Sequence, residues 1–176
     1  IGHPHESSSL VNQGAAYIHY KHEGGTDNWG LIETIYPDIP AVSDKFGAAL
    51  QLDQDTLVVS TNTETGSAYV FGRDENGADA WGQVRVIAHP DPETYDAFGR
   101  SLALSGDHLL IGADGHNQAS SRDGEAYLFG RDTGGIENWG LLATLNSSFP
   151  LRGGRFGASV AVGDTFAVVG APGEFS

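Results

Sequence analysis

Apolar residues occur along the chain in short runs that alternate with polar positions, and Gly, Asp or Ser residues separate the runs. In the clearest example an alternating run at residues 98–104 is followed by a turn at 105–107 and a second apolar run at 109–111. Two such runs joined by a short Gly/Asp turn predict a β-hairpin. The 3.6-residue period of an amphipathic helix is absent from the sequence. The pattern therefore predicts an all-β protein.

A three-part pattern recurs three times with constant internal spacing. In each copy a Tyr in an apolar run precedes a Trp-Gly pair by 12 residues, and a Phe-Gly pair follows that Trp by 17 residues. The three sets are Tyr17, Trp29 and Phe46; Tyr69, Trp81 and Phe98; and Tyr127, Trp139 and Phe156. A period of 52 to 58 residues predicts modules that bury their apolar faces against one another. Four short antiparallel strands in each module are typical of a β-propeller blade.

The repeats divide the chain into parts of a propeller segment. We expect an outer half-blade over residues 1–40, blades over 46–90 and 98–146, and an inner half-blade over 156–176. The Phe of each Phe-Gly pair should be nearly fully buried, next to a Gly that admits close backbone approach. The fixed spacing favours a structural role for the three Trp residues, although aromatic faces can also stack on sugars. These structural positions are Phe46, Phe98, Phe156, Trp29, Trp81 and Trp139.

Three repeats form an incomplete ring, because propellers typically close with 4–8 blades. Closure matters because it removes exposed strand edges. Two alternatives follow: the repeats belong to a longer propeller chain, or copies self-associate head to tail and complete each other's half-blades. The sequence contains no Met, and residues 1–4 align with residues 169–172, so that the two ends overlap. These features favour the longer chain.

Particular residues relate the chain to a known family. Phe156-Gly157 and, later, Gly170-Ala171-Pro172 spell the FG-GAP motif. The chain resembles FG-GAP repeat proteins, which are related to the β-propeller head of integrin α subunits. It is most similar to the bacterial secreted type, through GSAYVF at residues 66–71 and WGQV at 81–84. The resemblance implies that the Phe-Gly and Gly-Ala-Pro strands form the inner hairpin of a blade, and that the Tyr and Trp strands complete its outer half.

Calcium is the cofactor that the resemblance suggests. Integrin-type blades carry an Asp-rich calcium loop between their first two strands. The corresponding turns here, at residues 53–55, 105–107 and 163–164, are too short to supply the oxygen ligands that calcium needs. If calcium is bound, the longer loop over 113–124 is the expected place, because it is rich in side-chain oxygens. The residues expected to hold the metal are Asp114, Asn117 and Asp123.

The loop over 113–124 is also the expected ligand-binding loop. The loop between the second and third strands is the one that changes length between repeats, and variable loops on a fixed scaffold commonly carry binding. Its candidate ligand-binding residues are His116, Ser120 and Arg122. The alternative interpretation is a polar loop built from Asx turns. Separately, Asn146 begins an Asn-Ser-Ser glycosylation sequon, which matters only if the source glycosylates secreted proteins.

Composition and motif content disfavour several classes of function. The 176 residues carry a net charge of −14, which disfavours binding to nucleic acid or to anionic lipid. The sequence has no Cys and no apolar run long enough to span a bilayer. It contains no G-x-S-x-G, H-E-x-x-H or P-loop motif, so we expect no enzymatic activity.

We therefore expect a binding, adhesion or surface-structure scaffold module, located outside the cell or on its surface, that contacts a protein partner. The alternative function is a propeller lectin that binds glycans through its variable inter-strand loops. Fold alone does not decide between these functions, because one architecture can present many different surfaces.

Overall fold

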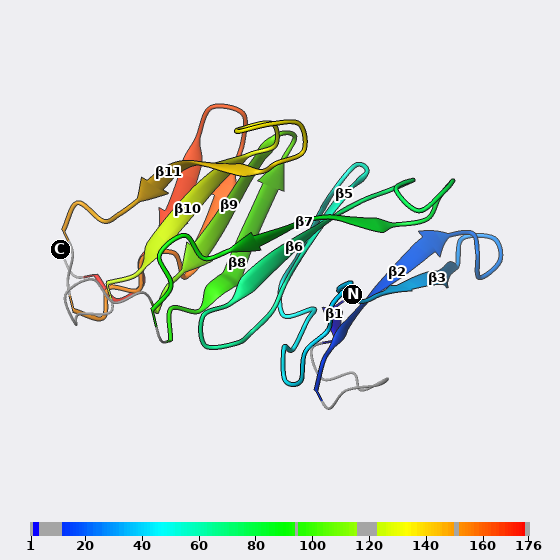
Figure 1. Ribbon diagram of the computed structural model, residues 1–176, viewed down its shortest axis with the longest axis horizontal. Helices are drawn as coiled ribbons and strands as arrows, with labels where there is room; N and C mark the ends of the chain where they lie inside the picture. Colours follow the sequence, from blue (N-terminus) through cyan, green and yellow to red (C-terminus); the bar gives the residue numbers. More distant parts are fainter. Residues whose placement is uncertain (1, 4–11, 94, 116–122, 150–151, 175–176) are drawn as a thin grey trace.

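The computed structural model describes residues 2–3, 12–93, 95–115, 123–149 and 152–174 (Figure 1). Over these ranges the chain forms thirteen β-strands and no helix, which confirms the all-β prediction. The strands form four separate antiparallel sheets, and no sheet closes on itself. This arrangement is that of an incomplete propeller segment. None of the described residues forms a helix that could span a bilayer.

Two sheets have four strands each, and their strands follow one another in chain order. One contains β4 (Leu50–Asp53), β5 (Thr56–Ser60), β6 (Ser67–Gly72) and β7 (Gly82–Ala88). The other contains β8 (Phe98–Ser105), β9 (His108–Ala113), β10 (Glu125–Gly130) and β11 (Gly140–Leu145). Each thus holds one Phe-Gly hairpin together with the Tyr and Trp segments that follow it.

The other two sheets are smaller. A three-stranded sheet contains β1 (Gly2–His3), β2 (Ala15–Lys21) and β3 (Trp29–Ile35). A two-stranded sheet contains β12 (Ser159–Val162) and β13 (Ala167–Gly170). The assignment of the four sheets to whole and half blades stays a prediction.

The predicted hairpin of the second repeat is confirmed. Strands β8 and β9 pair in antiparallel register, with Leu102 opposite Ile111 and Leu104 opposite Leu109. The Tyr and Trp strands also pair in every repeat, and each pair has a register shift at the same place. The shift follows Ile18 in the first repeat, Val70 in the second and Leu128 in the third, as a conserved bulge would produce.

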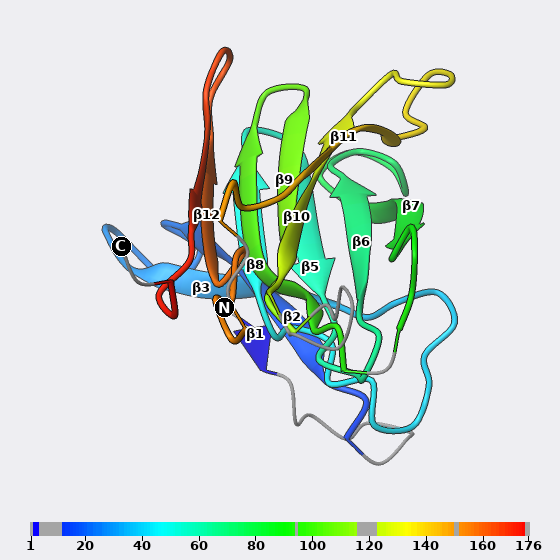
Figure 2. The same ribbon diagram turned by 90° about the vertical axis from the view of Figure 1, so that its left-hand side faces the viewer.

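The apolar core lies where neighbouring sheets face each other. The largest cluster joins Val58 and Val70 of one sheet to Phe98, Leu109 and Tyr127 of the next. Figure 2 shows these sheets standing side by side with their strands roughly parallel. A module of this kind buries its faces against its neighbours rather than within itself.

Whether a repeated aromatic residue is buried depends on the presence of a neighbouring sheet. Phe46 and Phe98 are completely or almost completely buried, as predicted. The prediction for Phe156 is wrong: its side chain is only half-buried, because the described chain places just the two strands β12 and β13 in its sheet. Trp81 and Trp139 are buried, whereas Trp29 exposes 64% of its surface. Trp29 lies on the first sheet, which has no described sheet before it.

A glycine three residues before each repeated Tyr fixes the approach of successive sheets. Gly14, Gly66 and Gly124 have left-handed φ angles of 81°, 76° and 79°. A Cβ at these positions would lie 2.1, 1.9 and 2.1 Å from the carbonyl oxygens of Phe46, Phe98 and Phe156, respectively. Only glycine accepts both this conformation and this approach. The constant spacing of this glycine from the repeated Tyr is a signal that the sequence itself carries.

Candidate binding face

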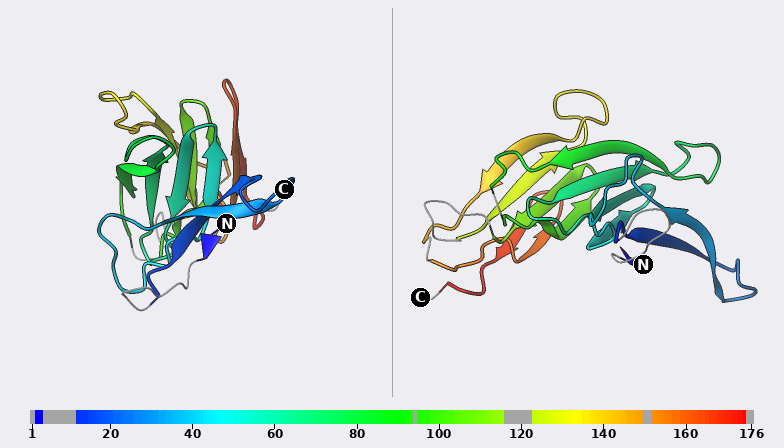
Figure 3. Two further views of the ribbon diagram at one scale, coloured as in Figure 1. Left: turned by 90° about the vertical axis from the view of Figure 1, so that its right-hand side faces the viewer. Right: turned by 60° about the horizontal axis from the view of Figure 1, so that its bottom comes forward.

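Antiparallel pairing separates the connections of the sheets into two ends. The turns inside hairpins, such as β8–β9 and β12–β13, lie together at one end (Figure 2). The connections that join β3 to β4, β5 to β6 and β7 to β8 emerge at the opposite end (Figure 3). We call this opposite end the loop end.

The loop end contains a hollow of about 560 Å³ between three connections. Its lining combines two exposed apolar side chains, Val42 and Tyr95, with a lysine, a glutamate and several uncharged polar groups. The residues that line this loop-end hollow are Val42, Ser43, Lys45, Asn62, Thr63, Glu64, Tyr95 and Ala97.

Backbone hydrogen bonds hold the walls of the loop-end hollow together. The Asn62 amide donates to the Asp44 carbonyl oxygen at 3.1 Å, which ties the β5–β6 connection to the β3–β4 connection. The Ala97 amide donates to the Glu64 carbonyl oxygen at 3.4 Å, which ties it to the β7–β8 connection. The hollow is therefore formed before any ligand arrives, which lowers the entropic cost of binding.

Four non-glycine residues of the loop-end hollow have a left-handed backbone. Their φ angles are 65° at Ser43, 52° at Lys45, 74° at Tyr95 and 56° at Ala97. Left-handed conformations of this kind cluster at functional sites. In the third repeat, however, the equivalent positions 153 and 155 have φ angles of 82° and 57°. The strain is therefore a property of the repeat and does not by itself mark the hollow as a site.

Two of the predicted calcium ligands are described by the structure. Asp114 is buried, and its carboxylate accepts hydrogen bonds from Arg155, at 3.0 Å from Nε and 2.6 Å from Nη2. Arg100 lies 3.4 Å from the other Asp114 oxygen. A cation at this carboxylate would have to displace two guanidinium groups. The Asp123 carbonyl oxygen accepts the Phe156 amide at 2.7 Å.

The other predicted loop residues lie outside the described residues. They are His116, Asn117, Ser120 and Arg122. Within the residues that the structure describes, no group of three or more His, Asp or Glu side chains could hold a metal ion. The structure therefore brings Asp114 together with arginines, and calcium binding by the loop stays a prediction.

The carboxylates of the short turns make internal contacts. Asp53 accepts the Gly106 amide at 2.7 Å, which joins the turns of neighbouring sheets. Arg131 donates to Asp107 at 2.8 Å, and its guanidinium lies 4.8 Å from the centre of the Trp139 ring. The Asp53–Gly106 hydrogen bond thus links two sheets, whereas the Arg131–Asp107 contact lies within one sheet.

Sequence reasoning missed a buried polar group beneath the loop end. His89 and Asp96 are both buried, with Nε2 and Oδ2 3.6 Å apart. The His89 ring packs edge-on against Phe98 and Tyr127, at centroid distances of 5.0 and 4.9 Å. Tyr127 donates its hydroxyl hydrogen to Glu125 at 2.5 Å, and burial, followed by this hydrogen bond, raises the pKa of the tyrosine. Of the residues in this buried group, the repeat pattern of the sequence singled out Tyr127 alone.

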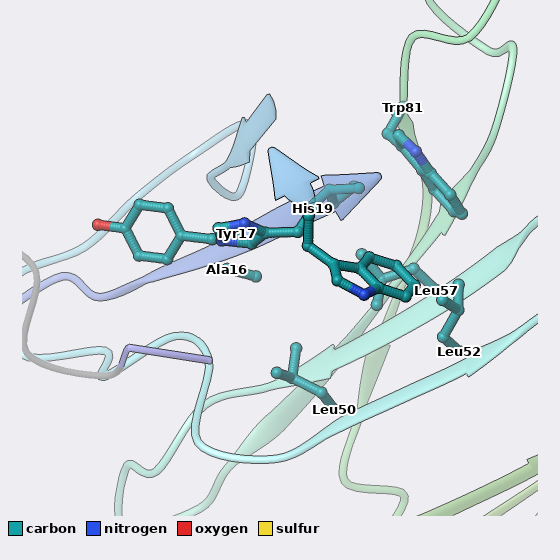
Figure 4. Close-up of a pocket in the computed structure, with 9 residues that line it drawn as sticks. Ala16, Tyr17, His19, Leu50, Leu52, Leu57 and Trp81 are labelled. Atoms are coloured by element: carbon teal, nitrogen blue, oxygen red, sulfur yellow. The ribbon is translucent and has the colours of Figure 1, made fainter. Parts of the chain in front are cut away.

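An apolar cleft of about 370 Å³ opens beside β2, between the first two sheets (Figure 4). Leu50, Leu52 and Leu57 form one wall, Trp81 lies at its edge, and β2 forms the opposite wall. We call it the β2 cleft. Its other lining residues are Ala16, Tyr17, Ile18, His19 and Trp29.

The glycosylation candidate Asn146 is exposed at the point where β11 ends. Its position allows a glycan to attach without unfolding the sheet, and its modification stays a prediction.

Comparison with known proteins gives one family. The model of the FG-GAP repeat matches residues 81–129, which run from Trp81 of the second repeat to Phe129 of the third. No curated protein sequence matches the chain. The matched segment contains Phe98-Gly99 at the start of β8 and Gly112-Ala113 at the end of β9, and these two strands pair as a hairpin. The chain therefore contains an FG-GAP repeat over residues 81–129.

Proposed function

We propose that this β-propeller-type module is an extracellular binding or surface-structure scaffold, and that it contacts a protein through its loop end. The observation that carries the proposal is the loop-end hollow, in which Val42 and Tyr95 are both about 60% exposed on walls tied by backbone hydrogen bonds. Tyrosine is enriched at protein interfaces because its ring is large, rigid and tipped with a polar group.

In this proposal the module binds its partner and does not catalyse a reaction. The charged side chains that line the hollow are Lys45 and Glu64, and neither lies in a catalytic motif of the sequence. The net charge of −14 supports a partner other than nucleic acid. The extracellular placement rests on the resemblance to secreted FG-GAP proteins.

A photo-crosslinking residue tests the protein-binding surface. We would replace Tyr95 with a benzophenone amino acid and expose the chain to intact cells of the source organism. The matched control is the same residue at Ile136, which is 91% exposed in the β10–β11 turn at the opposite end. A discrete protein adduct at position 95 that is absent at 136, and is lost with Val42→Asp, supports the proposal. Equal labelling at both positions contradicts it.

Glycan binding is the second candidate function. An aromatic face beside amide, hydroxyl and carboxylate groups is a combination that suits sugars, and Tyr95, Asn62 and Glu64 supply it in the loop-end hollow. A glycan array decides between the two functions. Binding to a defined set of sugars that Tyr95→Ala abolishes and Ile136→Ala preserves would favour the lectin.

A further inference from the structure

A histidine closes a turn at the start of the β7–β8 connection. The Asp91 amide donates a hydrogen bond to His89 Nδ1 at 3.0 Å. A ring nitrogen that accepts from an N–H carries no proton, so the proton of the neutral ring lies on Nε2. Nε2 lies 3.6 Å from Asp96 Oδ2, and the side chains of His89 and Asp96 are almost completely buried. The fold therefore buries a titratable ring in the one neutral form that can close this turn.

The third repeat closes the same turn with a group that does not titrate. Ser147 occupies the position of His89, because each lies nine residues before the Phe of its Phe-Gly pair. The Ser147 hydroxyl oxygen accepts the Phe149 amide at 3.0 Å, so the acceptor again lies two residues before the donor. A hydroxyl keeps its acceptor lone pairs as the pH changes, whereas a protonated imidazole carries hydrogen on both nitrogens and accepts nothing. The turn of the second repeat is therefore the acid-sensitive version.

The charged groups around the His89 ring favour its protonation. Asp96 of the β7–β8 connection faces Nε2. On β10 the ring packs against Tyr127, which donates to Glu125. Asp91 of the connection also acts electrostatically on Tyr127, as Asp96 and Glu125 do. Nearby negative charge stabilises an imidazolium and offsets the cost of its burial, so the ring can take up a proton while the sheets stay folded.

The β7–β8 connection also carries Tyr95, which lines the loop-end hollow. Asp96 follows Tyr95 in the chain, and its carboxylate both faces His89 and accepts the Glu93 amide. The Asp96 carbonyl oxygen accepts the Gly115 amide at 3.0 Å. Tyr95 has a left-handed φ of 74°, a conformation that persists only where surrounding contacts impose it. A change at His89 therefore reaches Tyr95 through the contacts of Asp96.

We propose that His89 makes the loop-end hollow acid-sensitive, so that a protein partner binds at neutral pH and is released in mild acid. This inference rests on the proposed function of the hollow. A proton from water adds to His89 Nδ1, and the new N–H then faces the Asp91 N–H, so that two donors oppose each other. The turn opens, and its contacts no longer hold Tyr95 on the wall of the hollow. The closing hydrogen bond is thus present above the pH at which the ring titrates and lost below it.

Nitrogen-15 NMR tests the switch without any partner. From about pH 8 to about pH 5, which spans the ordinary titration of histidine, the His89 ring and the Asp91 amide should shift along one shared curve. The Phe149 amide should not follow that curve. In His89→Asn the side-chain oxygen accepts the Asp91 amide at every pH, so this amide should not titrate. A ring that stays neutral until the chain unfolds, or one that titrates without the Asp91 amide, overturns the proposal.

A converse variant leaves the buried ring untouched. Ser147→His puts an imidazole into the equivalent turn of the third repeat, at a less buried position. The Phe149 amide should then shift with the titration of the introduced ring, which it does not do in the wild type. An insensitive Phe149 amide beside a titrating ring would contradict the role assigned to the acceptor.

Crosslinking from position 95 tests the effect on binding. The protein adduct should form at about pH 7.5 and be absent at about pH 5.5, whereas with His89→Asn it should form at both. His22→Asn is the matched control, because His22 Nδ1 also accepts a backbone amide, that of Asp27 at 3.1 Å. His22 lies in the β2–β3 turn, away from the loop end, so this variant should lose the adduct in acid as the wild type does.

The two measurements separate failure of the switch from failure of the proposed function. An adduct that persists in acid in the wild type overturns the release of the partner, whatever the NMR titration shows. If no adduct forms at either pH, the proposed protein binding at the loop end is wrong. The NMR titration then decides by itself whether His89 changes the β7–β8 connection.

Discussion

Val58 and Val168 occupy the same place in two equivalent hairpins, yet Val58 is completely buried and Val168 exposes 63% of its surface. The difference comes from the strand beside each of them. β6 pairs with β5 and covers Val58, whereas no described strand covers β13 on its outer edge. Equivalent residues of this chain should therefore differ in their contribution to stability, and several measurements can show it.

The Phe residues of the Phe-Gly pairs give the first test. Phe98→Ala removes an almost completely buried ring and should lower the free energy of unfolding by roughly 3–5 kcal/mol. Phe156→Ala should cost clearly less, because that side chain is only half-buried. Urea unfolding monitored by circular dichroism measures both. Equal losses for the two variants would contradict the difference in burial.

The glycine before each repeated Tyr gives a second test. A Cβ on Gly66 would lie 1.9 Å from the Phe98 carbonyl oxygen, and φ at this residue is 76°. Gly77 also has a positive φ, 120°, but a Cβ there would meet no atom within 4 Å. We expect Gly77→Ala to cost about 1–2 kcal/mol from backbone strain alone. Gly66→Ala should cost more, since the sheets must also move apart, and a similar melting temperature for the two variants would exclude that effect.

The arginines around Asp114 give a third test. Arg155→Ala should lower the free energy of unfolding by about 1–3 kcal/mol, because it takes the closest partner from a buried carboxylate. Arg100 is more exposed and its contact is longer, 3.4 Å, so Arg100→Ala should cost less than about 1 kcal/mol. Chemical denaturation ranks the two variants. In an Asp114→Asn background the cost of Arg155→Ala should shrink, and an unchanged cost would show that the pair is not the cause.

The pKa of Tyr127 predicts a loss of stability in alkali. Burial, followed by the hydrogen bond to Glu125, raises this pKa above the ordinary value of 10.0. Below that value the phenol keeps its proton in both the folded and the unfolded chain, and the stabilisation is fully present. As the pH rises above 10.0 the unfolded chain ionises first, so the free energy of unfolding falls.

Tyr127→Phe should reduce this alkaline fall, because the variant has no phenol to ionise. Urea unfolding at a series of pH values from about 8 upward measures the slope of the free energy of unfolding against pH. The loss of one proton from the phenol sets this slope. Tyr20→Phe, which removes an exposed phenol, is the control. The same slope in Tyr127→Phe and in the wild type would remove Tyr127 as the cause.

Calcium gives the last test. We expect no tight calcium site in the turns at residues 53–55 and 105–107, because Asp53 and Asp107 already bond within the protein and the turns offer too few ligands. Calorimetric titration after chelator treatment checks this. If heat is released, Asp53→Ala and Asp107→Ala should leave it unchanged, whereas Asp114→Ala combined with Asp123→Ala should abolish it. A tight event that survives the latter pair would rule out the longer loop.

The sequence by itself determined the local structure. Alternating polarity and short Gly/Asp turns predict the hairpin of β8 and β9, since the side-chain period of a strand is local. The constant distances between Tyr, Trp and Phe predict equivalent sheets. These signals depend only on residues close in the chain, and each is repeated three times.

Only the tertiary structure decided which of the equivalent residues are buried and which surfaces are open. Trp81 and Trp29 occupy the same position of the pattern, but Trp81 is buried by a preceding sheet and Trp29 is not. The loop-end hollow likewise needs three connections to meet, and the contact between His89 and Tyr127 needs two sheets to meet. Burial depends on the neighbouring module, and a repeat pattern is the same whether or not that neighbour is present.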